Sequence, residues 1–409
     1  MKRVVITGLG CITPVGNDVE TFWGAITAGK HGFTSVTRFD NANMKAKVAA
    51  EVKDFNAELY LPKSDFKRTD RHQMFAVAAA TQAVEDAGIQ GAVDPLRFGV
   101  YVGSGIGGLD TMVAQAEVMT KRGADRVSPF LIPMMIANLA AGLVAIKFNA
   151  KGANLPLVSA CATATHSIGE AFRAIKHGYA DAILAGGAES SLNALGVGGF
   201  TSAQALSTSA DPDNASMPFD KRRNGFIMGE GAGILVLESY EHAKARNAKI
   251  YCEIVGYGNT CDAYHVTAPH PKAEGTVNMI KQAFQESQLA PDEKLYINAH
   301  GTSTPLNDAT ETLAIKRAVG EQLAYKIPIS STKSMIGHLL GASGGVEAIA
   351  AVKALEMGII PPTANYKEPD PACDLDYVPN TARPYAIDKA FSTSMGFGGH
   401  NAGVLFTKL

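Results

Sequence analysis

The chain has 409 residues, of which 46% are hydrophobic and 19% charged, and its formal net charge is −2 at pH 7. Its length exceeds that of one average domain, so we expect two domains or one large two-part fold with an extensive core. The slightly negative charge argues against general affinity for nucleic acid or anionic membranes.

The cysteines and the first residues indicate a reducing compartment. Five cysteines, an odd and widely spaced set without a C-x-x-C pair, favour neither a disulfide framework nor a zinc or redox motif. After two basic residues the chain enters an expected strand, Val4–Thr7, without a hydrophobic secretory region. We therefore expect a cytoplasmic protein with free thiols.

Expected strands and helices alternate along the whole chain. Expected strands cover 4–7, 98–102, 155–158, 182–185, 234–238, 251–257, 295–298, 327–330, 391–393 and 402–407. Expected helices cover 19–28, 75–87, 109–119, the stretch between Cys161 and Gly178, 240–246, 277–286, 310–319 and 346–356. This order predicts an α/β fold with mostly parallel, well-covered sheets.

One segment, from Phe130 to Ile146, carries no charge over 17 residues. Its length is at the lower limit for a membrane span, and it contains Pro133, Asn138 and Gly142. We therefore predict one helix buried on all sides, in a large core or at a subunit interface. A homodimer is the expected assembly.

The two halves of the chain resemble each other in the order of their elements. The strand and glycine turn at 100–105 have a counterpart at 296–301, and the strand, turn and helix around Cys161 have one at 327–356. The two helices end at Gly178 and Gly358, 180 positions apart. We expect a duplicated α/β unit, with an N-terminal half at 1–250 and a C-terminal half at 251–409.

Cys161 is the first candidate for chemistry. It lies in the small-residue stretch 159–166, which is expected to connect a buried strand to the N-terminus of a helix. Unpaired backbone N–H groups at such an end favour the thiolate, which is the nucleophilic form of cysteine. A small buried cysteine without a reaction is the commoner case, so the assignment depends on other loops.

Three further loops follow expected strands in the second half. His300 lies in a loop with glycine and hydroxyl groups suited to bind a substrate, and His338 lies in a second loop between a strand and a helix. Phe397 lies in a glycine loop at 395–401, which predicts exposed N–H groups for an oxyanion beside a movable apolar gate. Loops at strand ends share one edge of such a fold, so we expect these loops to meet Cys161.

Three other patterns have weaker interpretations. The glycines at 103–108 fit a dinucleotide-binding pattern, but no second strand ending in an acid follows at the required distance. Ser343 lies in G-x-S-x-G with Asp376 and His400 in hydrolase order, but a poor strand precedes it. Two basic clusters are ordinarily solvated surface and could instead receive an acidic partner: Lys63, Lys67 and Arg68, and Lys121, Arg122 and Arg126.

Four motifs together resemble those of the β-ketoacyl-[acyl-carrier-protein] synthases: SACATATHSIG at 159–169, NAHGTSTP at 298–305, SSTKSMIGH at 330–338 and GFGGHN at 396–401. Within that family the chain resembles the elongating type II enzymes of fatty-acid synthesis over essentially its whole length. The resemblance implies the thiolase fold, a duplicated α/β unit in a five-layered αβαβα sandwich, and a homodimer that works with acyl carrier protein. The implied reaction joins a Cys-bound acyl chain to malonyl-carrier protein with loss of CO2, giving a 3-oxoacyl product two carbons longer.

The resemblance also implies catalytic roles. Cys161 takes the acyl chain as a thioester, and His300 and His338 promote malonyl decarboxylation and stabilise the enolate. Lys333 supports the second histidine. Glu347 belongs to a network behind it that in some members holds a monovalent cation, and no other cofactor or catalytic metal is implied.

Substrate-binding roles follow from the same resemblance. The N–H groups of Cys161 and Phe397 stabilise the thioester oxyanion, and Phe397 also belongs to the gate. Four residues contact substrate: Thr302 and Thr304 the phosphopantetheine arm, and Ile106 and Phe200 the acyl pocket.

Three residues depart from the commonest motifs of the family. Ser159, Met395 and His400 stand where threonine, phenylalanine and threonine are usual, and none of these changes removes a functional group from the mechanism. The alternatives to fatty-acid elongation are a polyketide or specialised ketosynthase, a non-catalytic acyl-binding subunit and a hydrolase acting through Ser343.

Overall fold

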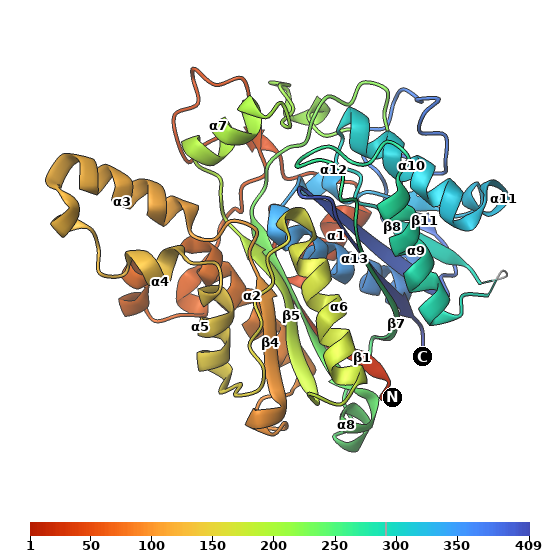
Figure 1. The fold of residues 1–409 in the computed structure, drawn as a ribbon, viewed down its shortest axis with the longest axis horizontal. Coiled ribbons are helices and arrows are strands. Elements are labelled where there is room, and N and C mark those ends of the chain that lie inside the picture. The colour runs from red at the N-terminus through yellow and green to blue at the C-terminus, as the bar shows by residue number, and fades with distance from the viewer. Residues whose placement is uncertain (291–292) are drawn as a thin grey trace.

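The computed structural model describes residues 1–290 and 293–409, and nine of its strands form one mixed sheet (Figure 1). The order is β4-β5-β6-β1-β7-β13-β12-β8-β9. The strands are β1 (Val4–Ile12), β4 (Phe98–Gly103), β5 (Ala182–Glu189), β6 (Gly231–Ser239), β7 (Cys252–Cys261), β8 (Leu295–Asn298), β9 (Ile329–Ser330), β12 (Lys389–Gly396) and β13 (His400–Thr407). Two short pairs lie apart: β2 (Thr34–Ser35) with β3 (Val48–Ala49), and β10 (Ile359–Ile360) with β11 (Arg383–Pro384).

The expectation of mostly parallel sheets is wrong. Only β4–β5, β12–β8 and β8–β9 are parallel, and the other five neighbouring pairs are antiparallel. The reason is that the last strand of each half, β6 or β13, runs antiparallel to both of its neighbours, and the halves join through an antiparallel β1–β7 pair.

The predicted duplication is confirmed by the strand order. Outward from the β1–β7 junction, β1-β6-β5-β4 in the first half matches β7-β13-β12-β8 in the second. Beside β4, the place that β9 takes beside β8 is taken by the irregular segment 152–155, which makes three backbone hydrogen bonds to β4 and one parallel bridge, between Asn154 and Val100. The strand expected at 155–158 is therefore absent, although its counterpart β9 is present.

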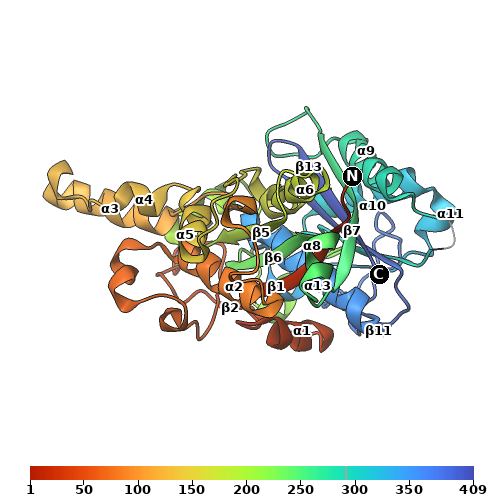
Figure 2. The ribbon, with the colours of Figure 1, turned by 90° about the horizontal axis from the view of Figure 1, so that it is seen from below.

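Helices cover both faces of each half-sheet. They are α1 (Val19–Thr27), α2 (Arg71–Ala87), α3 (Leu109–Arg122), α4 (Leu131–Met135), α5 (Leu139–Phe148), α6 (Thr163–Lys176), α7 (Ala194–Ser202), α8 (Tyr240–Ala245), α9 (Glu274–Ser287), α10 (Pro305–Val319), α11 (Glu321–Ala324), α12 (Lys333–Ile336) and α13 (Ser343–Met357). α6 and α13 pack together between the half-sheets, α2 covers the outer face of the first half, and α9 and α10 cover that of the second (Figure 2). The result is the five-layered αβαβα arrangement of a thiolase-type fold.

Small residues allow the two central helices to approach the strands. A Cβ added to Gly345 of α13 would lie 2.2 Å from the carbonyl oxygen of Gly233 in β6. A Cβ added to Gly169 of α6 would lie 2.1 Å from the ring of Tyr257 in β7. Such contacts exclude any larger side chain, so glycine at these positions sets the spacing of the central layers.

The uncharged segment at 130–146 is not one buried helix. It forms α4 and α5 with a break at 136–138, and Ile132 and Ile146 are 56% and 77% exposed. The α3–α4 region projects from the body of the molecule (Figures 1 and 2), whereas α5 packs one face against α2 and β4 and buries Ala140, Ala141 and Val144. Among the described residues, no helix has the length and apolar character that crossing a membrane requires.

Candidate active site

The turn that carries Cys161 lies at the centre of the molecule. Cys161 occupies a 3-10 turn at Ala160–Ala162, directly before α6, and is 9% exposed. Ala160 has a φ of 52°, a left-handed conformation that alanine rarely adopts. The predicted helix N-terminus is confirmed, whereas an irregular segment takes the place of the predicted strand before it.

Burial controls the protonation of Cys161. It raises the pKa of the thiol to about 12, although the Lys333 cation and the N–H groups of Phe397 and Cys161 itself act in the opposite direction. The N–H group of Cys161 at the helix end acts in the predicted direction and favours the thiolate, but desolvation outweighs it and the pKa of the thiol is raised overall. The contact of the Phe397 and Cys161 N–H groups with the sulfur places the two predicted oxyanion donors beside it.

His300 presents an N–H group to the site. Its loop follows β8, and Glu311 of α10 holds the backbone, accepting from the N–H groups of His300 and Gly301 at 2.8 Å each. Lys333, which is predicted to support His338, instead donates through its Nζ to His300 Nδ1 at 3.3 Å, so the ring proton of His300 lies on Nε2. Burial, and then the charge of Lys333, lower the pKa of His300 well below its usual value.

His338 has the same tautomer as His300. The N–H of Leu340 donates to its Nδ1 at 3.2 Å, and Ser343 Oγ lies 2.9 Å from the same atom, so Nε2 carries the proton. Burial, and then Lys333, lower the pKa of His338 well below its usual value. The ring centroids of His300 and His338 are 5.4 Å apart and the rings are almost perpendicular, so two neutral imidazoles line the same cavity.

Behind the histidines lies a buried ion pair. Lys333 Nζ binds Glu347 Oε1, and the two side chains are 1% and 0% exposed. Burial raises the pKa of Glu347, opposed by Lys333. Glu347 Oε2 is buried and has no hydrogen-bond partner in the structure. The charge of Lys333 adds to the effect of burial in keeping both imidazoles neutral.

One cavity of about 370 Å³ brings most of the predicted residues together. Its lining includes Cys161, Phe200, His300, Thr302, Thr304, His338, Met395, Phe397 and His400. The hydroxyls of Thr302 and Thr304 are 2.9 Å apart, and the rings of Phe200 and Phe397 are 6.3 Å apart. Ile106 is not among the lining residues and is 40% exposed, so its place in the acyl pocket stays a prediction.

Two buried acids of α10 were missed by sequence reasoning. Asp308 accepts from the N–H groups of Thr302 and Ser303, and Glu311 holds the His300 loop as described. Proline at the first helical position and an acid in the first turn are helix-start signals. Pro305 and Asp308 therefore mark an earlier start than the predicted residue 310 and place both acids beside the loop.

The residues of the competing motifs are not arranged for the hydrolase or dinucleotide-binding function that those motifs would predict. Ser343 is fully buried and contacts His338 from behind, outside the cavity lining, while Asp376 is bound to Arg383. The hydrolase alternative is therefore wrong. In the glycine turn at 103–108, Glu189 accepts the N–H of Gly105 at 2.7 Å and occupies the place of a phosphate.

Comparisons with known proteins agree with this geometry. The family models for the β-ketoacyl synthase N-terminal and C-terminal domains match residues 1–243 and 251–367. The 3-oxoacyl-[acyl-carrier-protein] synthase 2 of Synechocystis sp. is 51% identical over 409 residues, covering 100% of this chain and 98% of the relative. The protein of the same name from Coxiella burnetii is 47% identical over 410 residues, covering 100% and 99%.

Solved structures show the same architecture. A β-ketoacyl synthase from Burkholderia phymatum superposes with a TM-score of 0.93 at 35% identity, covering 100% of both chains. A type II polyketide acyl-carrier protein in complex with its ketosynthase gives a TM-score of 0.91 at 34% identity, covering 100% and 99%.

Fold and site together define a thiolase-fold condensing enzyme, an acyltransferase that forms carbon–carbon bonds. A cysteine and two imidazole donors in one cavity are the groups that such chemistry needs. The chain belongs to the β-ketoacyl synthase family.

Proposed function

We propose that the protein elongates fatty-acyl chains held on acyl carrier protein. It joins an acyl group on Cys161 to a malonyl unit with loss of CO2 and leaves a 3-oxoacyl chain, two carbons longer, on the carrier. The observation that carries this proposal is the pair of neutral Nε2–H donors, His300 and His338, lining one cavity with the Cys161 thiol.

The first half-reaction transfers the acyl group. The Cys161 sulfur attacks the carbonyl carbon of the acyl-carrier thioester, and the N–H groups of Cys161 and Phe397 bind the oxyanion. A new C–S bond to the enzyme forms, the carrier's C–S bond breaks, and the cysteine proton passes to the departing carrier thiol.

The second half-reaction forms the carbon–carbon bond. The bond between the malonyl methylene and its carboxylate breaks, CO2 leaves, and the electron pair forms an enolate whose oxygen accepts from His300 and His338. The enolate carbon attacks the Cys161 thioester, the C–S bond to the enzyme breaks, and the thiolate takes up a proton. Burial, and then the charge of Lys333, keep both imidazoles neutral, so each donates a hydrogen bond and does not transfer its proton.

Fatty-acid elongation is favoured over a polyketide function. The relatives at 47–51% identity are named 3-oxoacyl-[acyl-carrier-protein] synthase 2, while the polyketide ketosynthase complex is 34% identical. The complete site argues against a non-catalytic acyl-binding subunit. The free cysteines fit a cytoplasmic location, and the unpartnered Glu347 Oε2 is the oxygen that a monovalent cation would bind.

Intact-protein mass spectrometry tests the reaction. The protein is mixed with long-chain acyl carrier protein and then with malonyl carrier protein, and the Cys161→Ala variant serves as control. We expect an acyl adduct that the variant lacks and that malonyl carrier protein discharges as a 3-oxoacyl chain two carbons longer. No adduct with acyl chains of any length contradicts the proposal and returns attention to an acyl-binding subunit.

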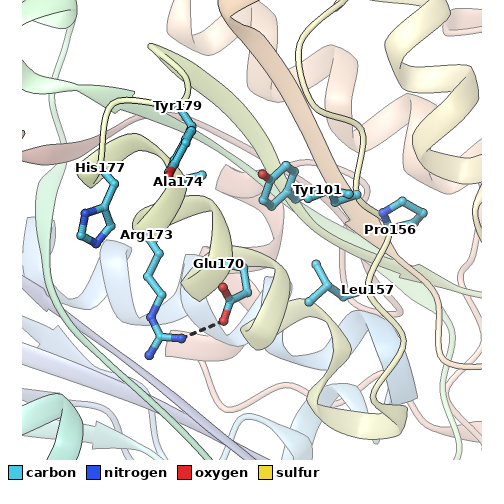
Figure 3. A pocket seen from close by; sticks show the side chains of 9 residues that line it. Tyr101, Pro156, Leu157, Glu170, Arg173, Ala174, His177 and Tyr179 are labelled. Carbon is cyan, nitrogen blue, oxygen red and sulfur yellow. Dashed lines mark hydrogen bonds and ion pairs between the residues drawn. The ribbon is translucent and has the colours of Figure 1, made fainter.

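A homodimer is the second part of the proposal. The segment 155–158 forms no strand, and among the described residues only its first N–H, that of Leu155, bonds to the sheet, at Val100 of β4; Leu155 and Val158 are 53% and 57% exposed. Beside it, a cavity of about 590 Å³ is lined by Tyr101, Leu155–Leu157 and the C-terminal part of α6 (Figure 3). An extended apolar segment with free backbone groups is suited to pair with the same segment of a second copy.

Sedimentation equilibrium tests this assembly. We expect twice the chain mass for the unaltered protein and a shift toward the single chain for Val158→Glu, because a charge would enter the paired surface. Leu59→Glu, at a residue 72% exposed elsewhere, is the control and should not change the mass. A single-chain mass for the unaltered protein at all concentrations contradicts the homodimer.

A further inference from the structure

A row of hydrogen bonds behind the nucleophile turn has no part in the mechanism above. His166 lies in the first turns of α6, is 5% exposed and separates Ser159 from Asn259. Its Nδ1 is 2.6 Å from Ser159 Oγ, and its Nε2 is 3.0 Å from Asn259 Oδ1. A buried imidazole with both nitrogens bonded is held in one orientation.

The outer partners decide which way these hydrogen bonds point. Asn259 Nδ2 lies 3.5 Å from Glu170 Oε1, which orients the amide with Oδ1 toward the imidazole. An amide oxygen only accepts, so His166 Nε2 carries the proton and Nδ1 accepts the hydroxyl proton of Ser159. Glu170 is held in turn by Arg173 at 3.0 Å, as Figure 3 shows.

Ser159 opens the turn that carries the nucleophile. Its N–H donates to Thr163 Oγ1 at 2.9 Å, and its carbonyl accepts from the N–H of Ala162 at 3.1 Å. Gly396 of the gate packs so tightly here that a Cβ would lie 2.7 Å from that carbonyl oxygen. The left-handed Ala160 follows, and such a conformation persists only when its surroundings hold it.

We propose that His166 is a positioning residue: by accepting the Ser159 hydroxyl, it holds the turn at 160–162 so that Cys161 Sγ and its own N–H face the cavity. His166 touches neither the substrate nor the reacting atoms and acts only through the turn. Burial, the largest influence, lowers the pKa of His166, which favours the neutral imidazole that this acceptor role needs. The acyl-transfer readout below rests on the proposed function, whereas the alkylation readout does not.

Three variants test the inference. Ser159→Ala removes the hydroxyl, His166→Phe removes the acceptor, and Ser159→Thr keeps a hydroxyl at the same position. We expect the first two to slow both the alkylation of Cys161 by iodoacetamide and its acylation by acyl carrier protein about tenfold, the effect of losing one buried hydrogen bond. Ser159→Thr should keep both rates close to those of the unaltered protein.

A second readout separates positioning from general damage. Decarboxylation of malonyl carrier protein should change by less than about twofold in all three variants, because His300 and His338 stand on other loops. The Ser159→Ala/His166→Phe double variant should be no slower than the slower single variant, since both remove one interaction. If His166→Phe does not fold, Ser159→Ala against Ser159→Thr decides the question.

Other outcomes overturn the inference. Equal rates for Ser159→Ala and the unaltered protein would show that the hydrogen bond does not orient the nucleophile. Equal losses of alkylation and decarboxylation would show a structural role for the whole site instead. If the unaltered protein is alkylated at Cys161 but never acylated, the proposed function fails, while alkylation of the variants still decides the role of His166.

Discussion

Burial, more than any single neighbouring charge, determines the protonation of the reacting residues. It raises the pKa of Cys161 to about 12 and lowers the pKa of His300 and His338 well below their usual values. The reacting end of the cavity therefore presents a neutral thiol and two neutral imidazoles, with the Lys333–Glu347 pair behind them. An apolar acyl chain on Cys161 therefore lies beside neutral catalytic groups, which costs less than placing it beside buried charges.

The raised pKa of Cys161 predicts how alkylation depends on pH. Because only the thiolate reacts, the iodoacetamide rate should rise about tenfold per pH unit from neutral pH to about pH 10, without a plateau. The rate is measured by intact mass, with Cys161→Ala as the blank. A plateau below about pH 8 would contradict the raised pKa, because it would mean that the thiolate is already fully formed there.

Lys333 predicts a separation of stability from chemistry. Lys333→Met leaves the Glu347 carboxylate buried and unpaired, so the free energy of unfolding in urea should fall by about 3 kcal/mol. The Lys333→Met/Glu347→Gln variant removes both charges and should recover most of that stability. Malonyl decarboxylation should stay impaired in both, since Nδ1 of His300 has lost its donor; recovery of activity with stability would contradict the assigned role.

At the scale of elements, the first turns of α10 carry the His300 loop. Asp308 and Glu311 accept four backbone N–H groups of residues 300–303, so this loop is held by the helix that follows it. These hydrogen bonds fix the backbone of a glycine-containing loop, which would be free to move without the helix.

Glu311 supplies a test at this scale. In Glu311→Gln, an NH2 group would face one of the two N–H donors of His300 and Gly301, so the loop should shift. We expect malonyl decarboxylation to fall about tenfold, while alkylation of Cys161 stays unchanged. Glu321→Gln, at an exposed position in α11, is the control; equal effects of the two substitutions would contradict the positioning role of Glu311.

The sequence predicted most helices and strands, but it did not predict which neighbours surround each of them. Strong apolar patterns, such as those of β6 and α13, predict the element correctly, because such a segment can be buried against any apolar neighbour. The segment 155–158 has a strand-like composition, but the contacts with the edge of β4 end at Leu155, and composition cannot show whether a neighbour is present. Motif order identified Cys161, His300 and His338, whereas the thiol pKa depends on burial, which a pattern does not contain.

At the scale of the whole molecule, stability depends on how closely the central helices approach the sheet. Gly345→Ala places a methyl group 2.2 Å from the Gly233 carbonyl oxygen, so the layers must separate. We expect a loss of about 2 kcal/mol in the free energy of unfolding. The control is Gly24→Ala in α1, where nothing lies within 4 Å and a gain of about 0.5 kcal/mol is expected; equal effects would contradict the packing argument.

The shared cavity around Cys161 has a kinetic consequence. Since the cysteine and both histidines line the same space, the proposed function predicts that the acyl-loaded and the malonyl-loaded carrier compete for this cavity and occupy it in turn. Initial rates should follow a ping-pong pattern, with parallel double-reciprocal lines at low concentrations and mutual substrate inhibition at high ones. The speed of the enzyme then depends on the ratio of the two loaded carriers, with a maximum between the extremes, and that ratio becomes a control on chain growth.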